Sequence, residues 1–235
     1  MAVASNEPPG PLFEHESLNL EQQNFRLLRL LPTSHVDAIE CELTVEASPS
    51  VPQDPTQAET QDDERKVSYN ALSYEWGSED APQHWIRINK GHFKIRHNLW
   101  EFLRMAVAKL HVLSEVEFAE PLWIDAICIN QKALLERAHQ VKQMGDIYRC
   151  ARAVFVWLGP SCSQQLNVVS QELKRLGQEA ENPPLQMTPY DIFLQSRYLR
   201  DQVIGPSSAV RQAFLEICDR PYWTRMWIAQ EIICA

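Results

Sequence analysis

Apolar and polar positions form their clearest pattern between residues 122 and 159. An apolar run at 122–129 stops at Asn130 and Gln131, and a second run at 153–158 stops at a Gly-Pro pair. Between them, apolar or small side chains recur every three or four positions, which predicts a helix with one apolar face. That face consists of Leu134, Ala138, Val141, Gly145, Tyr148 and Ala151. A strand, a helix and a strand in this order predict a βαβ unit with parallel strands.

The two predicted strands are apolar without alternation, as is typical of a parallel sheet covered on both faces. Ligands of such sheets bind outside the carboxyl ends of the strands, so we expect Asp125, Asn130 and Gln131 to lie at a ligand site. Asp125 sits inside the first apolar run and must be hydrogen-bonded or face a cleft, because an unpaired buried charge is costly. The alternative is a structural Asp125 that accepts backbone N–H groups or pairs with Arg137. Asn130 alternatively caps the following helix.

Three further strands are predicted on the N-terminal side of this unit. Residues 25–31 form an apolar run that ends before a proline, which suggests an edge strand. Residues 39–45 alternate between apolar and polar, the pattern of a half-buried strand. Residues 69–77 predict a strand that runs into a tight turn at Gly77.

A hairpin and a helix follow that turn. Residues 85–88 and 93–95 flank an Asn-Lys-Gly sequence, which predicts a β-hairpin with a positive φ at Gly91. Asn98 is a candidate N-cap for a helix over residues 99–110. Together the elements predict an α/β fold, in which helices flank a mostly parallel sheet with an added β-hairpin.

Two segments offer little to bury. Residues 1–24 are polar and contain prolines, which predicts a disordered N-terminal tail. Residues 47–66 are rich in acidic and polar residues, which predicts a disordered acidic insertion.

Residues 207–234 look helical with a break at 219–221, and no strand follows before Ala235. We therefore expect one domain over residues 25–235 whose C-terminal end is truncated.

Composition narrows the functional classes. The chain has 235 residues and a formal net charge of −9, so nucleic acid and anionic membrane surfaces are not expected partners. It contains no basic-then-apolar signal segment and no apolar run of about 20 residues. The six scattered cysteines favour free thiols in a reducing, cytoplasmic location. No metal site is expected, because the seven histidines show no ligand spacing with each other or with cysteine.

The strand exit at residues 73–77 is a second candidate ligand site. Polar groups at a strand's carboxyl end, followed by a glycine turn, present hydroxyl and backbone N–H groups to a ligand. Ser73, Tyr74, Trp76 and Gly77 are the candidate residues here. The alternative is an ordinary strand exit with Trp76 packed into the core.

The C-terminal helical pattern contributes one unusual carboxylate. Glu231 follows Trp227 by one helical turn and has isoleucines beside it. A carboxylate among apolar side chains tends to have a raised pKa, a recurrent sign of a working site. The alternative is an ordinary glutamate on a helix surface. Glu136 and Arg137 are interpreted as a solvated helix surface.

These segments, taken in order, resemble the HET (heterokaryon incompatibility) domain of filamentous fungi. The residues that carry the resemblance are 69–77, 122–131, Glu136-Arg137 with Gln140, Met144 and Ile147-Tyr148, 151–159 and 225–231. The resemblance covers residues 25–235 and implies an effector of the programmed cell death that follows fusion of genetically different hyphae. Such a domain is usually part of a longer protein.

A more distant similarity is to TIR domains, which implies a flavodoxin-like, TIR-like sheet. Some TIR domains cleave NAD through a helical Glu in a pattern similar to residues 227–232, which implies Glu231 as the catalytic carboxylate. NAD is then a substrate, and no cofactor is expected. The reaction passes through an oxocarbenium-like transition state that a carboxylate stabilises. In this hypothesis Ser73, Trp76 and Asp125 shape the pocket.

Two other hypotheses remain open. The domain is alternatively a non-enzymatic signalling module that associates with itself as a homo-oligomer or with other incompatibility proteins. It is otherwise an inactive fragment, as the abrupt end of the chain suggests.

Overall fold

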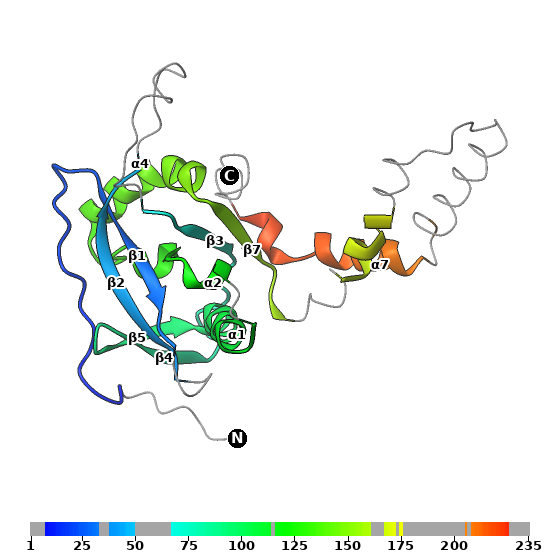
Figure 1. The fold of residues 1–235 in the computed structure, drawn as a ribbon, viewed down its shortest axis with the longest axis horizontal. Coiled ribbons are helices and arrows are strands. Elements are labelled where there is room, and N and C mark those ends of the chain that lie inside the picture. The colour runs from blue at the N-terminus through cyan, green and yellow to red at the C-terminus, as the bar shows by residue number, and fades with distance from the viewer. Residues whose placement is uncertain are drawn as a thin grey trace, which may run out of the picture. The chain divides into compact units, whose positions relative to one another are not determined.

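The computed structural model describes residues 8–32, 38–49, 67–113, 116–160, 167–172, 174–175, 205 and 208–225. The chain divides into two compact units, Met1–Trp157 with Arg225–Ala235, and Leu158–Thr224. The first unit is built on one sheet (Figure 1). Of the predicted insertion at 47–66, residues 50–66 lie outside the described residues, as do the C-terminal residues 226–235.

The sheet has seven strands in the order β5-β4-β2-β1-β6-β3-β7. The strands are β1 Asn24–Leu30, β2 Glu40–Ala47, β3 Asn70–Tyr74, β4 Gln83–Ile88, β5 Gly91–Arg96, β6 Leu122–Trp123 and β7 Ala153–Trp157. Strand β3 lies between β6 and β7 and is parallel to both. The pairs β1–β2, β1–β6 and β4–β5 are antiparallel, and β2–β4 is parallel. The predicted α/β class is confirmed. The sheet is mixed and not mostly parallel, since three of its strand pairs are parallel and three are antiparallel.

Strand β1 occupies the middle of the sheet. It pairs with β2 on one side and with β6 on the other, so the predicted edge position is wrong. The strand is buried from Phe25 to Leu28, including Arg26. A proline after the strand suggested an edge, but the proline lies beyond the paired residues and removes no ladder hydrogen bond.

The predicted hairpin forms between β4 and β5, but its glycine has a different role. The two turn residues are Asn89 at φ 47° and Lys90 at φ 71°, as a two-residue type I′ turn requires. Gly91 starts β5 without a positive φ, so the prediction of a positive φ at this glycine is wrong. A Cβ atom at Gly91 would lie 2.7 Å from the Cα of Phe13, so close backbone approach requires glycine here.

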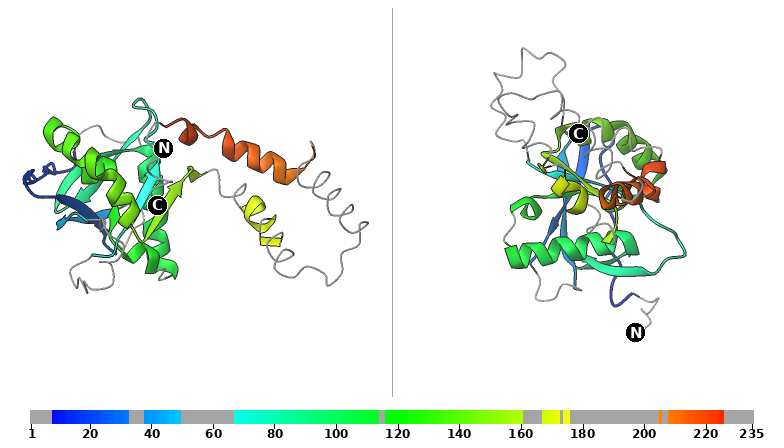
Figure 2. Two further views of the ribbon diagram at one scale, coloured as in Figure 1. Left: turned by 90° about the horizontal axis from the view of Figure 1, so that it is seen from above. Right: turned by 90° about the vertical axis from the view of Figure 1, so that its right-hand side faces the viewer.

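Two long helices, α1 His97–Leu113 and α4 Leu134–Cys150, pack beside the strands (Figures 1 and 2). The α1 helix starts earlier than predicted, so Asn98 lies inside it and is not the N-cap. A short α2 helix, Val116–Ala119, follows. Phe102 of α1 and Phe118 of α2 contact the rings of Trp157 and Phe155 on β7.

The predicted helix over 134–151 is confirmed, but its predicted apolar face coincides only in part with the buried face. Tyr148 is buried, and Val141 and Ala151 are partly buried against the core. The buried residues are Glu136, Gln140, Gln143, Met144, Ile147 and Tyr148, whereas Leu134 is 67% exposed. The Gln140 amide donates to the Asn24 carbonyl at 2.6 Å. Apolar periodicity misplaced this face because half of its buried residues are polar, and their partners lie in segments distant in sequence, such as Asn24 for Gln140.

The apolar run at 122–129 forms a two-residue strand, β6, and then a short helix, α3 Asp125–Cys128. The amides of Ile127 and Cys128 donate to the Ile124 carbonyl at 3.0 and 2.7 Å. Asp125 is therefore the first residue of a helix and not part of a strand, although it follows a strand end as expected.

The second unit is described in part. Residues 167–172 and 174–175 are helical. Helix α7, Ala209–Cys218, is capped by the Ser208 hydroxyl, and the 3-10 turn η4, Pro221–Thr224, follows the predicted break. Of the helices that the structure describes, none has both the length and the apolar character needed to cross a membrane.

Candidate functional site

A pocket of about 560 Å³ opens where the parallel strands β3 and β6 end. Its walls come from the loop after β3, from α3 and the loop behind it, and from the first turns of α4. The lining residues described are Glu75, Trp76, Gly77, Asp125, Ile129, Gln131, Arg137, Val141, Met144 and Arg225. The position is the one that parallel strands favour for ligands.

Trp76 and Asp125 join the two strand ends. The indole Nε1–H of Trp76 donates to both carboxylate oxygens of Asp125, at 2.9 and 3.1 Å. The Ala126 amide also donates to Asp125, at 2.7 Å. Asp125 thus accepts a backbone N–H, as the structural alternative predicts, and it also lines a cleft, as the ligand-site prediction requires. Both side chains are half-buried.

The loop that carries Trp76 is held by two side chains, those of Arg96 and Asn98. Arg96 donates to the Gly77 carbonyl at 2.7 Å and lies over the Trp76 ring at 5.4 Å. Gly77 has a φ of 77°, which explains the glycine predicted at this turn. Asn98 donates to the Glu75 carbonyl at 2.5 Å. The indole is therefore fixed before any ligand binds.

The two predicted site residues in the loop between α3 and α4 have different roles. Gln131 lines the pocket, and its amide donates to the Asp125 carbonyl at 2.9 Å. The Asn130 side chain accepts from the Lys132 amide at 3.1 Å and does not cap α4, whose N-cap is Ala133. Asn130 shapes the loop, and it is absent from the described lining of the pocket.

Arg26 of β1 and Glu136 of α4 form a buried ion pair, so the interpretation of Glu136 as a solvated surface residue is wrong. The Arg26 guanidinium lies 2.7 Å from Glu136, and the two side chains are 2% and 6% exposed. Glu136 also accepts from the Asn130 amide at 2.7 Å. Burial raises the pKa of Glu136, but the bonds from Arg26 and Asn130 outweigh burial and leave the pKa below its ordinary value. In the sequence, an arginine within the apolar run at 25–31 could have indicated a buried charge that needs a partner.

The other predicted residues are only partly gathered at the pocket. Trp76, Gly77, Asp125 and Gln131 line it. Ser73 and Tyr74 are buried within β3, where burial raises the pKa of Tyr74. Trp227 and the predicted catalytic Glu231 lie outside the described residues.

The lining residues missed by sequence reasoning are Glu75, Ile129, Arg137, Val141, Met144 and Arg225. Two of them are cationic, so the pocket combines guanidinium groups with the carboxylates of Glu75 and Asp125. Within the described residues, no cluster of three or more His, Cys, Asp or Glu side chains is suited to a metal ion.

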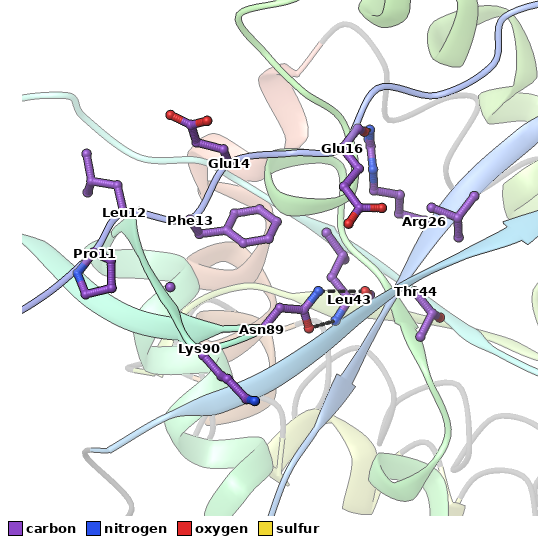
Figure 3. A pocket seen from close by; sticks show the side chains of 12 residues that line it. Pro11, Leu12, Phe13, Glu14, Glu16, Arg26, Leu43, Thr44, Asn89 and Lys90 are labelled. Atoms are coloured by element: carbon purple, nitrogen blue, oxygen red, sulfur yellow. Dashed lines mark hydrogen bonds between the residues drawn. The ribbon is translucent and has the colours of Figure 1, made fainter.

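A cavity of about 680 Å³ lies between residues 11–16, β2 and the β4–β5 turn (Figure 3). Two of its polar side chains, those of Asn89 and Arg26, are engaged in the fold. The Asn89 amide donates to the Leu43 carbonyl and accepts from the Leu43 amide, and Arg26 is bound to Glu136. The pocket at β3 and β6 is therefore the better candidate for chemistry.

The heterokaryon incompatibility protein (HET) family matches residues 69–231, a span that contains every described lining residue of the candidate pocket. Heterokaryon incompatibility protein 6, OR allele, of Neurospora crassa is 31% identical over 251 aligned positions. That alignment covers 96% of this chain and 34% of the relative, so the chain spans about a third of the relative's length. No solved structure matches the chain, and the TIR-like arrangement stays a prediction. The family match and this relative together show that the chain belongs to the HET family.

Proposed function

We propose that this chain acts in heterokaryon incompatibility as a cell-death effector domain, and that its pocket binds a nucleotide such as NAD. The relative from Neurospora crassa carries heterokaryon incompatibility in its name. The observation that carries the ligand proposal is the convergence of Trp76 and Asp125 at the ends of two parallel strands. Such strand ends are where α/β sheets bind ligands.

The lining of the pocket suits the parts of a dinucleotide. The half-buried Trp76 offers an aromatic surface against which a planar ring can stack. Arg137 and Arg225 offer guanidinium groups, which suit phosphate oxygens in geometry and charge. The carboxylates of Glu75 and Asp125 suit a cationic ring.

The proposed reaction is hydrolysis of the nicotinamide–ribose bond. Water adds to the ribose carbon as the bond to nicotinamide breaks, and the products are ADP-ribose, nicotinamide and a proton. The leaving group is already a pyridinium, so no acid has to protonate it. We assign Glu231 the role of stabilising the cationic transition state, on the resemblance to TIR domains.

Nicotinamide release from NAD by the purified chain tests this proposal. A Glu231→Gln variant should lose about 100-fold or more in rate if electrostatic stabilisation dominates. Glu42→Gln, an exposed residue of β2, is the matched control and should retain full activity. Equal rates in both variants would remove Glu231 from the mechanism.

A second candidate, a self-associating signalling module, is favoured by two apolar side chains at the start of α4. Leu134 and Leu135 are 67% and 78% exposed. Light scattering against concentration should show association that is lost in a Leu134→Gln/Leu135→Gln variant. A monomer at all concentrations would remove this candidate.

A further inference from the structure

The residues from 11 to 16, here called the N-terminal segment, lie against the outer edge of β5. The Phe13 amide donates to the His92 carbonyl at 2.9 Å, and the His92 amide donates to the Pro11 carbonyl at 2.7 Å. Figure 3 shows Pro11, Leu12 and Phe13 beside the β4–β5 turn. Residues 11–13 of the predicted N-terminal tail are thus attached to the sheet, and glycine at position 91 permits this contact.

The same segment reaches α3 through His15. The His15 ring packs edge-on against Phe13 and Phe93, at centroid distances of 5.0 and 5.7 Å. Its Nε2–H donates to the Ile127 carbonyl at 2.7 Å, which assigns the proton to that nitrogen. His15 therefore links the segment to the last turn of α3.

A second bond secures the same turn. Arg26 donates to the Cys128 carbonyl at 2.9 Å and to the Glu16 carbonyl at 2.6 Å. Two consecutive carbonyls of α3, those of Ile127 and Cys128, are thus held by His15 and by an arginine that also holds the segment.

The first residue of α3 is Asp125, which accepts the Trp76 indole in the candidate pocket. Because α3 is a single turn of four residues, contacts at its end also set the position of its beginning. We infer that the N-terminal segment is a clamp on α3 that positions Asp125 in the pocket, and that protonation of His15 releases the clamp.

The surroundings of His15 favour its neutral form. Burial lowers the pKa of His15 most; the Ile127 carbonyl and Glu136 of α4 oppose this, whereas Arg26 of β1 and Lys132 of the α3–α4 loop add to it. The remaining charged neighbours in sequence are Glu14 and Glu16 on the segment itself, and β5 presents the Phe93 ring.

The sign of the pH dependence follows from this lowered pKa. A released histidine has its ordinary pKa of about 6.5. The clamp is therefore fully present above about pH 6.5 and weakens as the pH falls towards the lower pKa of docked His15.

Hydrogen exchange of the full chain tests the inference without any ligand. The backbone amides of residues 124–129 are followed at about pH 7.5 and about pH 5.5, either side of the ordinary histidine pKa, with correction for the intrinsic rates. Wild-type protection should fall at the lower pH, by at most about tenfold per pH unit for one proton.

Two substitutions at His15 separate hydrogen bonding from titration. His15→Gln keeps a donor and should hold protection nearly constant across the two pH values. His15→Phe keeps the ring contacts but loses the donor, and should lower protection at both. His84→Gln, at another histidine in an aromatic cluster, is the control and should retain the wild-type pH dependence.

A third variant disturbs the N-terminal segment through a substitution in β5. Gly91→Ala should displace the segment, because its Cβ would meet the Phe13 backbone. Loss of protection in both the segment and residues 124–129 is expected. Lost protection in the segment alone, or an unchanged pH dependence in His15→Gln, would overturn the inference. The significance of the clamp for ligand binding rests on the proposed function, but a failure to cleave NAD leaves these exchange results unaffected.

Discussion

Two polar pairs tie strands to the stretch from α3 to α4, and they differ in how closed they are. Arg26 and Glu136 are 2% and 6% exposed at their side chains. Trp76 and Asp125 are half-buried and line a pocket. Both pairs hold the same stretch of chain. Arg26 also borders the cavity beside β2, but its guanidinium is bound to Glu136, whereas Trp76 and Asp125 line the pocket at the strand ends.

The closed pair has few free bonding positions left. Arg26 donates to Glu136 and to the carbonyls of Cys128 and Glu16, and Glu136 also accepts from Asn130. A buried charge pair with all these partners specifies structure. The open pair lies beside cationic side chains at strand ends, where binding is favoured. We therefore expect the first pair to contribute to stability and the second pair to the proposed function.

Breaking the closed pair should have the largest effect on stability. Glu136→Leu leaves Arg26 charged and buried, so the free energy of unfolding should fall by about 3–5 kcal/mol. Arg26→Met combined with Glu136→Leu should regain most of that loss, because no unpaired charge remains. Urea denaturation of both variants measures this. A loss below about 1 kcal/mol in the single variant would place the pair in the class of surface ion pairs.

The same pair should also make the protein sensitive to acid. The pKa of Glu136 is lower in the folded chain than its ordinary value of 4.5. Its contribution to stability is therefore complete above that value and is lost as the pH falls towards the folded pKa. Unfolding measured between neutral and acid pH should show a shallower acid loss in the Arg26→Met/Glu136→Leu variant than in the wild type. Identical slopes would contradict the lowered pKa.

Breaking the open pair should affect binding more than stability. Trp76→Phe keeps a ring but removes the donor to Asp125, which should cost about 1 kcal/mol of unfolding free energy. ADP-ribose binding, measured by calorimetry, should weaken about tenfold, the equivalent of roughly one lost hydrogen bond to a charged group. Trp85→Phe is the matched control, since its Nε1 has no partner among the described residues. Equal weakening in both variants would show that Trp76 has no particular role.

The smallest effect is expected on the outer face of α4. Leu134→Gln removes an apolar side chain that is 67% exposed, so the unfolding free energy should change by at most about 0.5 kcal/mol. Thermal unfolding checks this. A larger loss would indicate that Leu134 packs against another surface, and would revise the boundary between the buried and exposed faces of α4.

Local patterns predicted the parts of the fold that depend on local chemistry. The β4–β5 hairpin and the α4 helix follow from turn residues and periodicity, and both are confirmed. The central position of β1 and the polar face of α4 were missed. Both depend on side-chain partners about a hundred residues away in sequence, such as Glu136 for Arg26.

The sequence predicted those site residues that directly follow a predicted strand. Trp76, Gly77, Asp125 and Gln131 line the pocket because they follow β3 and β6. Ser73 and Tyr74 are buried, since β3 is covered throughout its length and its side chains have no open face. Arg137 and Arg225 carry no local signal, because only the fold brings them to the strand ends.

The central claim is that the open pair at the ends of β3 and β6 forms the functional site. Binding of ADP-ribose to the wild type, Asp125→Asn and Glu42→Gln, by calorimetry at neutral pH, tests it most directly. The account predicts binding by the wild type and by Glu42→Gln, and a reduction of about tenfold or more in Asp125→Asn, which loses the charge that holds Trp76. Equal affinity in Asp125→Asn and the wild type would contradict it.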